Sequence, residues 1–222
     1  MKTYQFPELT EAQLLEVVTL KEEDSLNYPW VDVSDISISA DEQSTISIIK
    51  ARLSRDRILL MNETTVWVRA IYPLLLLAER GLIQAWTEVA LSATFADITL
   101  SGTVDSVLAR VVAGVVRLPY FVMLDAKRAV ENKSPRIQLY GQLLVAAKLN
   151  WQTKPDSPEM QEIYGCYTVG DMWTFVRATV QGLDKETEKP LMTVETSQEF
   201  IERVEAETIL KILKKIVALY ET

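Results

Sequence analysis

Apolar residues recur with the period of an α-helix through the N-terminal third of the chain. Thr10 followed by Gln13 is a capping box, in which each side chain accepts a backbone N–H of the other residue. The spacing predicts helices over 11–22, over 40–61, and from a cap at Asn62 to Gly81. Pro73 lies inside the third helix and predicts a kink or a restart there. We therefore expect residues 1–80 to form a helical region packed on a core.

The pattern then changes to that of strands. Alternating, β-branched and aromatic residues predict strands over 83–95 and 98–108. Residues 119–127 form a continuous apolar run, which is typical of a strand buried on both faces. A helical pattern over 136–149 follows, and then two strand patterns over 162–169 and 172–180. Gly170-Asp171 between the last two predicts a two-residue hairpin turn.

The end of the chain predicts one more strand and a closing helix. Residues 191–195 have the pattern of an edge strand, and Thr196 with Glu199 forms a second capping box that opens a helix over 198–220. The order of elements predicts an α/β fold with a mixed central sheet flanked by helices. In this fold, residues 81–222 form the core. We expect a right-handed strand–helix–strand crossover unit within it, made of residues 119–127, 136–149 and 162–169.

Composition restricts the class of protein. The chain has 222 residues, of which 48% are hydrophobic and 24% charged, and this suits one globular domain with an appended helical region. No apolar stretch approaches the roughly 20 residues that a membrane span needs. The first residues lack the apolar core of an export signal, so we expect a cytoplasmic protein without membrane contact.

The absence of histidine narrows the chemistry further. With no histidine and only Cys166, a catalytic triad with a histidine base, an internal disulfide and a cysteine-ligated zinc site are all excluded within one chain. Carboxylates remain as the ligands for a metal ion.

Two aspartates and a lysine are placed to hold a divalent metal. Asp105 follows Gly102 by three residues in one predicted strand, and Asp125 ends the buried strand with Lys127 two residues later. Alternate residues of a strand point to the same face, so the side chains of Asp125 and Lys127 can share a water molecule. Mg²⁺ prefers hard oxygen ligands, and a lysine can assist the attacking water or neutralise charge on a phosphate.

At this point the sequence resembles the PD-(D/E)XK nuclease superfamily, which has the restriction-endonuclease-like fold. The resemblance covers about residues 79–180, including the run 163–175, which is similar to a hairpin in several nucleases. Its site positions are Glu88, Gly102, Asp105, Asp125, Lys127 and Gln138. The resemblance implies a nuclease that acts on DNA with Mg²⁺ or Mn²⁺. Asp105 and Asp125 would bind the metal with Glu88, Lys127 would be catalytic, and Gln138 would assist beside the metal.

The sequence also departs from the family. One branch has a tyrosine four positions after the glutamine, where this chain has Gln142, and that branch's helix histidine has no counterpart here. Glu79 could replace the histidine as a metal ligand, with a solvated helix end as the alternative. Asp105 could equally face solvent, Asp125 and Lys127 could form a surface ion pair, and Gln138 could be an exposed residue of a first helical turn.

The net charge of −8 opposes DNA binding, because lysine and arginine supply most of the non-specific affinity for nucleic acid. A local basic surface could come from residues 127–148, preceded by Arg110 and Arg117, or these residues could be an ordinary solvated face. The alternative function is therefore a non-catalytic interaction module, or a complex subunit, that retains the nuclease fold. Two kinds of assembly remain as alternatives. One is a complex with a partner subunit that supplies a basic surface, and the other is a homodimer.

Overall fold

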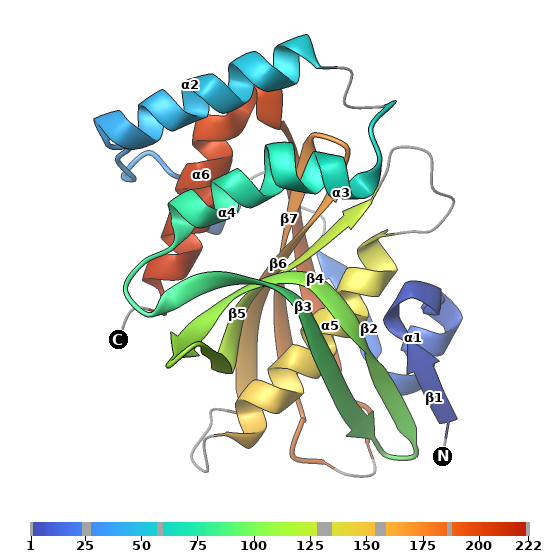
Figure 1. The fold of residues 1–222 in the computed structure, drawn as a ribbon. Coiled ribbons are helices and arrows are strands. Elements are labelled where there is room, and N and C mark those ends of the chain that lie inside the picture. The colour runs from blue at the N-terminus through green and yellow to red at the C-terminus, as the bar shows by residue number, and fades with distance from the viewer. Residues whose placement is uncertain are drawn as a thin grey trace.

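The computed structural model describes residues 2–23, 28–56, 60–127, 135–153, 159–185 and 188–220, with the backbone alone over 119–127 (Figure 1). The described strands are β1 (Lys2–Gln5), β2 (Thr19–Glu23), β3 (Ile83–Phe95), β4 (Ile98–Val112), β5 (Val115–Lys127), β6 (Met160–Val169), β7 (Met172–Gln181) and β8 (Leu191–Ile201). The described helices are α1 (Glu11–Val17), α2 (Ala40–Arg55), α3 (Glu63–Val66), α4 (Tyr72–Ala78), α5 (Pro135–Gln152) and α6 (Glu202–Ala218). Short helical turns, η1 (Phe6–Glu8), η2 (Pro29–Val31) and the π-helical η4 (Trp67–Ile71), complete the list.

One mixed sheet organises the molecule, in the order β1-β4-β5-β6-β7-β8-β2, with β3 paired to β4. The meander β3-β4-β5 is antiparallel, and β5 pairs parallel with β6 after the crossover helix α5. The hairpin β6-β7 turns at Gly170, whose φ of 64° is the left-handed conformation that favours glycine. The predicted α/β class, the mixed sheet and the strand–helix–strand crossover are thus present.

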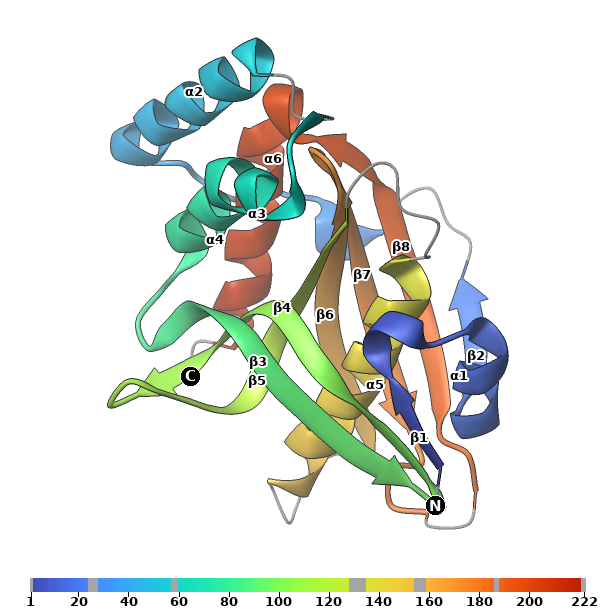
Figure 2. The same cartoon turned by 45° about the vertical axis from the view of Figure 1, so that its right-hand side comes forward.

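The N-terminal region is not a purely helical extension. β1 pairs parallel with β4, and β2 pairs parallel with β8 at the far end of the sheet order. The predicted helix over 11–22 was therefore too long: it ends at Val17, and 19–23 instead pair with 191–195. The segment from β1 to β2 thus joins the two ends of a strongly curved sheet and passes over α5 between them (Figures 1 and 2).

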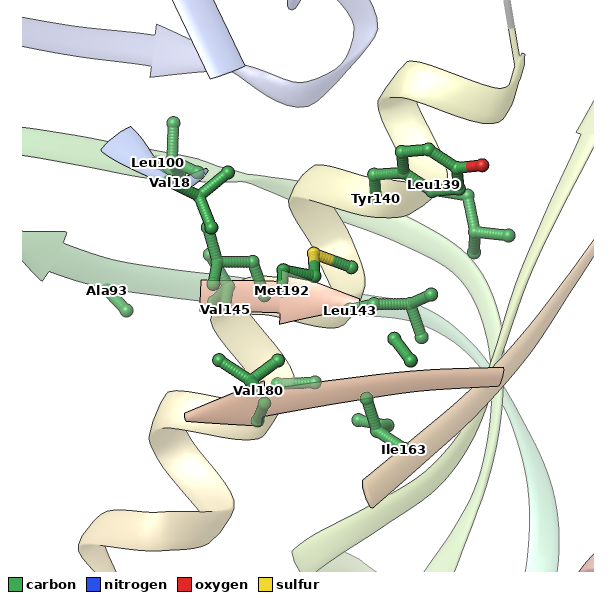
Figure 3. Close-up of a cluster of buried hydrophobic side chains, with 14 of the residues drawn as sticks. Val18, Ala93, Leu100, Leu139, Tyr140, Leu143, Val145, Ile163, Val180 and Met192 are labelled. Carbon is green, nitrogen blue, oxygen red and sulfur yellow. The ribbon is translucent and has the colours of Figure 1, made fainter. Parts of the chain in front are cut away.

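This arrangement encloses α5. Every residue from Ile137 to Ala147 is buried, so the helix has no solvent-facing stripe in this stretch. A helix that is buried all round is expected to lack amphipathic patterning. Leu143 and Val145 of α5 pack with Ile163, Val180 and Met192 of the sheet (Figure 3).

A second layer of helices covers the opposite face of the sheet. α2, α4 and α6 pack there on Tyr164, Cys166, Trp173, Phe175 and Phe200. Alternation along β6 explains the two layers, because Ile163 joins the α5 cluster and Tyr164 joins the other. Cys166 is buried, as a small apolar residue would be.

Two other predicted boundaries differ from the structure. α2 ends at Arg55, before the predicted end at 61, although Asn62 does cap the next helix by accepting the Thr65 N–H at 2.8 Å. Pro73 lies in the first turn of α4, directly after the π-helical turn, where its missing donor costs little. The predicted capping box at Thr196 was wrong, because β8 continues to Ile201 along β7 and lies inside the sheet, with β2 beyond it.

Candidate functional site

The strands β4 and β5 separate at Asp105. The last described pair between them is Ser106 with Leu124, and beyond it β5 continues along β6 until Lys127 lies beside Val169. On the edge of β4 away from β3, β5 occupies 106–112 and β1 occupies 98–101. The backbone therefore forks between Ser101 and Ser106, and we refer to this place as the fork.

The two predicted metal ligands each lie one residue beyond the last pair of β4 and β5. Asp105 precedes Ser106 on β4, and Asp125 follows Leu124 on the antiparallel β5. Facing residues of an antiparallel pair have Cβ atoms about 4.5–5.5 Å apart while the pairing lasts. Asp105 is half-buried between the buried Val104 and Ser106. The side chains of Asp125 and Lys127 lie outside the described residues, so their contacts with Asp105 stay a prediction.

Glu88 lies opposite Asp105 on β3. The flanking pairs are Thr87 with Ser106 and Val89 with Val104, and Glu88 has a φ of 55°, which is uncommon for a residue with a side chain. Such a left-handed conformation costs on the order of 1–2 kcal/mol. Backbone strain of this kind concentrates at functional sites.

The side-chain faces of the β3–β4 ribbon also change at this position. Ala85 and Leu108, which form one facing pair, join the helix-layer cluster. Leu91 and Val104, on the other side of Glu88, join the α5 cluster instead. The packed face of β3 therefore changes from one core cluster to the other at the fork, whereas on β4 Val107 and Ala109 still belong to the α5 cluster.

Gln138 is the fourth residue of α5 and is buried, with 5% exposure. Tyr140 points to β2, where its hydroxyl donates to Glu22 Oε1 at 2.9 Å, and a Cβ on Gly141 would meet Leu9 of the N-terminal segment. A rotation of about 100° per residue puts Gln138 on roughly the opposite side of α5 from Tyr140. The exposed-residue alternative for Gln138 is wrong, because its side chain is buried.

Gln142 carries a buried amide. In the sequence it was notable only because one nuclease branch has a tyrosine at this position. It is fully buried one turn after Gln138 on the same flank, and neither its Nε2 nor its Oε1 has a hydrogen-bond partner among the residues that the structure describes. An unsatisfied buried polar group costs about 1–3 kcal/mol. The spacing of four residues from Gln138 was the available signal for a second amide on this flank.

Glu79 does not lie with Asp105. Its Oε1 accepts the backbone N–H of Ala85 at 2.8 Å, so it caps the open edge of β3 next to the end of α4. Ala85 is three residues from Glu88, which is about 10 Å along a strand. Among the residues that the structure describes, which do not include the Asp125 side chain, no three acidic, histidine or cysteine side chains gather in a metal-binding group.

Gly102, the first residue of the Gly-x-x-Asp motif, has no room for a side chain. It has a φ of 148°, and the Phe6 ring of η1 lies where a Cβ would project. Phe6 is buried, so the N-terminal segment seats directly on the strand that carries Asp105.

Glu202 is a fully buried acid that the sequence did not indicate. It begins α6, and its Oε2 accepts the indole N–H of Trp173 at 2.8 Å, while Oε1 has no hydrogen-bond partner within the described part of the chain. Burial raises the pKa of its carboxyl to about 8, the hydrogen bond from Trp173 opposes this rise, and the neighbouring Asp171 adds to it. Asp171 itself is paired with Arg203 at 2.8 Å. Glu202 therefore lies near the β6–β7 hairpin turn. That turn directly follows Val169, which pairs with Lys127 of β5.

Comparison with known proteins adds no family assignment: no protein-family model matches the chain, and no curated protein matches it either. None of the described helices is long and apolar enough to cross a membrane. The interpretation of the site therefore depends on its own residues and register.

Proposed function

We propose that this protein is a metal-dependent nuclease with a restriction-endonuclease-like core, which hydrolyses DNA phosphodiesters in the cytoplasm. The observation that supports it best is the fork, where β4 and β5 separate and Asp105 and Asp125 each lie one residue beyond their last pair, Ser106 with Leu124. The crossover helix α5 begins after β5, and Gln138 is buried near its start. An arrangement kept only for packing would not need these residue types at these positions.

The donor set fits Mg²⁺ or Mn²⁺. Asp105 and Asp125 would supply hard anionic oxygens, and the half-buried position of Asp105 limits competing solvent. Glu88, exposed opposite Asp105, would be a further ligand or would bind a metal-associated water. A bound Mg²⁺ would lower the pKa of its water and offset charge on the phosphate. We assign no metal role to Glu79, because its carboxylate is engaged at Ala85.

The remaining roles belong to Lys127 and Gln138. Lys127 follows Asp125 by two residues on β5, so its ammonium group would orient the attacking water and offset charge on the scissile phosphate. Gln138 would form a hydrogen bond through its amide to the attacking water or to a metal ligand. Because the Gln138 side chain is buried, its orientation would be fixed.

The test is cleavage of supercoiled, linear and single-stranded DNA in Mg²⁺, in Mn²⁺ and in EDTA. Wild type should cleave only with metal, and D105N, D125N and K127A should each abolish cleavage while retaining the circular dichroism spectrum of the folded protein. D97N is a matched control, because Asp97 is an exposed aspartate in the β3–β4 turn, eight residues from Asp105. Cleavage that survives D125N and K127A, or no cleavage by wild type, would refute the nuclease proposal.

The net charge of −8 favours a second candidate, a non-catalytic module of the same fold that binds a basic partner subunit. This candidate predicts no cleavage and no metal dependence. The same cleavage assay distinguishes the two.

A further inference from the structure

Arg110 and Arg117 lie directly opposite each other near the tip of the β4–β5 hairpin. Both side chains are exposed. Within the part of the chain that the structure describes, neither guanidinium group has a hydrogen-bond, ion-pair or aromatic partner. The pair is therefore a concentrated positive charge on a protein whose net charge is −8.

The hairpin holds the two arginines in a fixed relation. Its turn residues Ala113 and Gly114 have φ of 53° and 72°, the two successive left-handed residues of a tight type I′ turn. Val112 pairs with Val115 just beyond the arginines, and both valines are exposed. Figures 1 and 2 show this hairpin, in light green, projecting at the margin of the molecule.

Like charges at facing positions of an antiparallel pair are unfavourable, because their Cβ atoms lie about 4.5–5.5 Å apart. An anion held between the two guanidinium groups removes the repulsion. The planar fork of donors on arginine matches the oxygens of a phosphate in a two-point contact.

We propose that Arg110 and Arg117 together clamp a backbone phosphate of the DNA substrate. This inference rests on the proposed function, since it extends the substrate surface away from the fork. Arg110 is five residues from Asp105 along β4, which corresponds to about 17 Å. DNA rises about 3.4 Å per nucleotide along each strand, so the clamp contacts the substrate roughly five nucleotides from the cut.

The experiment measures binding separately from cleavage. Fluorescence anisotropy with a labelled DNA duplex in EDTA, at salt from 50 to 300 mM, compares wild type with R110Q, R117Q and the double variant. Each phosphate contact contributes about 0.9 to the slope of log affinity against log salt, so the double variant, which loses one clamped phosphate, should lose about 0.9 from the slope. Its affinity at 50 mM salt should fall by at least about tenfold.

Two further variants guard against indirect effects. R52Q removes the same charge from an exposed arginine on α2, far along the molecule from the hairpin, and should leave the slope unchanged (Figure 1). R117E places a carboxylate opposite Arg110, so it should raise the thermal midpoint through the new pair while weakening DNA binding more than R117Q does.

The outcomes separate this inference from the nuclease proposal. If wild type cleaves DNA but the double variant binds with the wild-type slope, or R52Q weakens binding as much, the clamp is refuted and the nuclease stands. If wild type binds through the arginines but cleaves no substrate, the clamp stands and the nuclease is refuted. If wild type does not bind DNA at low salt, the clamp is refuted.

Discussion

Phe6 and Gly102 are in such close contact that a Cβ atom on residue 102 would lie 2.8 Å from Cδ2 of Phe6. This contact joins the N-terminal segment to β4 three residues before Asp105. The glycine of the sequence motif is thus required by packing against a residue almost one hundred positions earlier, in addition to any role beside a metal.

G102A should therefore destabilise the protein by about 1–3 kcal/mol, through the clash with Phe6 and the strained φ. F6A should cost about 3–5 kcal/mol by leaving a cavity. Because F6A removes the clashing ring, the double variant should be more stable than the sum of the two losses predicts. Urea unfolding of the four proteins measures this coupling, and strictly additive losses would show that the contact is not the cause.

The buried Glu202 should make stability depend on pH. Its folded-state pKa of about 8 lies above the ordinary value of 4.5, so the folded protein binds a proton that the unfolded chain releases. The stability linked to this proton is complete below about pH 4.5 and is lost as the pH rises toward 8. E202Q keeps an acceptor for Trp173 and removes the titration, so its advantage over wild type should grow from pH 5 to pH 8.

Thermal midpoints of wild type and E202Q at pH 5, 6, 7 and 8 measure this effect. E199Q is the matched control, because Glu199 is exposed on β8 and its substitution should leave the pH profile unchanged. Parallel profiles for wild type and E202Q would mean that Glu202 does not hold the extra proton.

Gln142 should be replaceable with a gain in stability. Q142M has a similar volume and removes two buried groups that lack partners, so it should stabilise the protein by about 1–2 kcal/mol. Q138M should give no such gain, because Gln138 has an interaction to lose. Guanidinium unfolding measures both, and a Q142M variant less stable than wild type would indicate that an ordered water satisfies the amide.

A divalent metal should stabilise the folded protein if Asp105 contributes to a binding site. Mn²⁺ or Mg²⁺ at 100 times its dissociation constant should add about 2.7 kcal/mol to the free energy of unfolding. D105N should lose this gain, and D97N should keep it. An equal midpoint shift in wild type and D105N would mean that the metal binds elsewhere.

The elements that the sequence predicted well are those with long, regular patterns. Strand 83–95 was recognisable because it buries alternate side chains towards both ends, and the crossover helix because Pro135 opens a long, largely apolar segment. β1 and β2 were not, because each has at most five residues and is stabilised by a partner strand far along the chain. Local propensity gives no information about such distant pairing.

The site shows the same contrast. The strand positions of Asp105 and Asp125 followed from local pattern, and the antiparallel pairing of β4 and β5 ends one residue before each of them. The burial of Gln142 and Glu202 could not be predicted, since it depends on tertiary packing such as that of Glu202 against Trp173. Glu79 was a plausible ligand in sequence, yet its distance from Asp105 depends on where α4 meets β3.

The pairing of β1 and β2 with opposite ends of the sheet has a consequence for synthesis of the protein. Residues 19–23 leave the ribosome long before their partner residues 191–195. The enclosure around α5 therefore cannot close until 191–195 have also emerged. Until then the apolar surface of α5 stays accessible, so a nascent chain that ends before 191–195 is the form most in need of a chaperone.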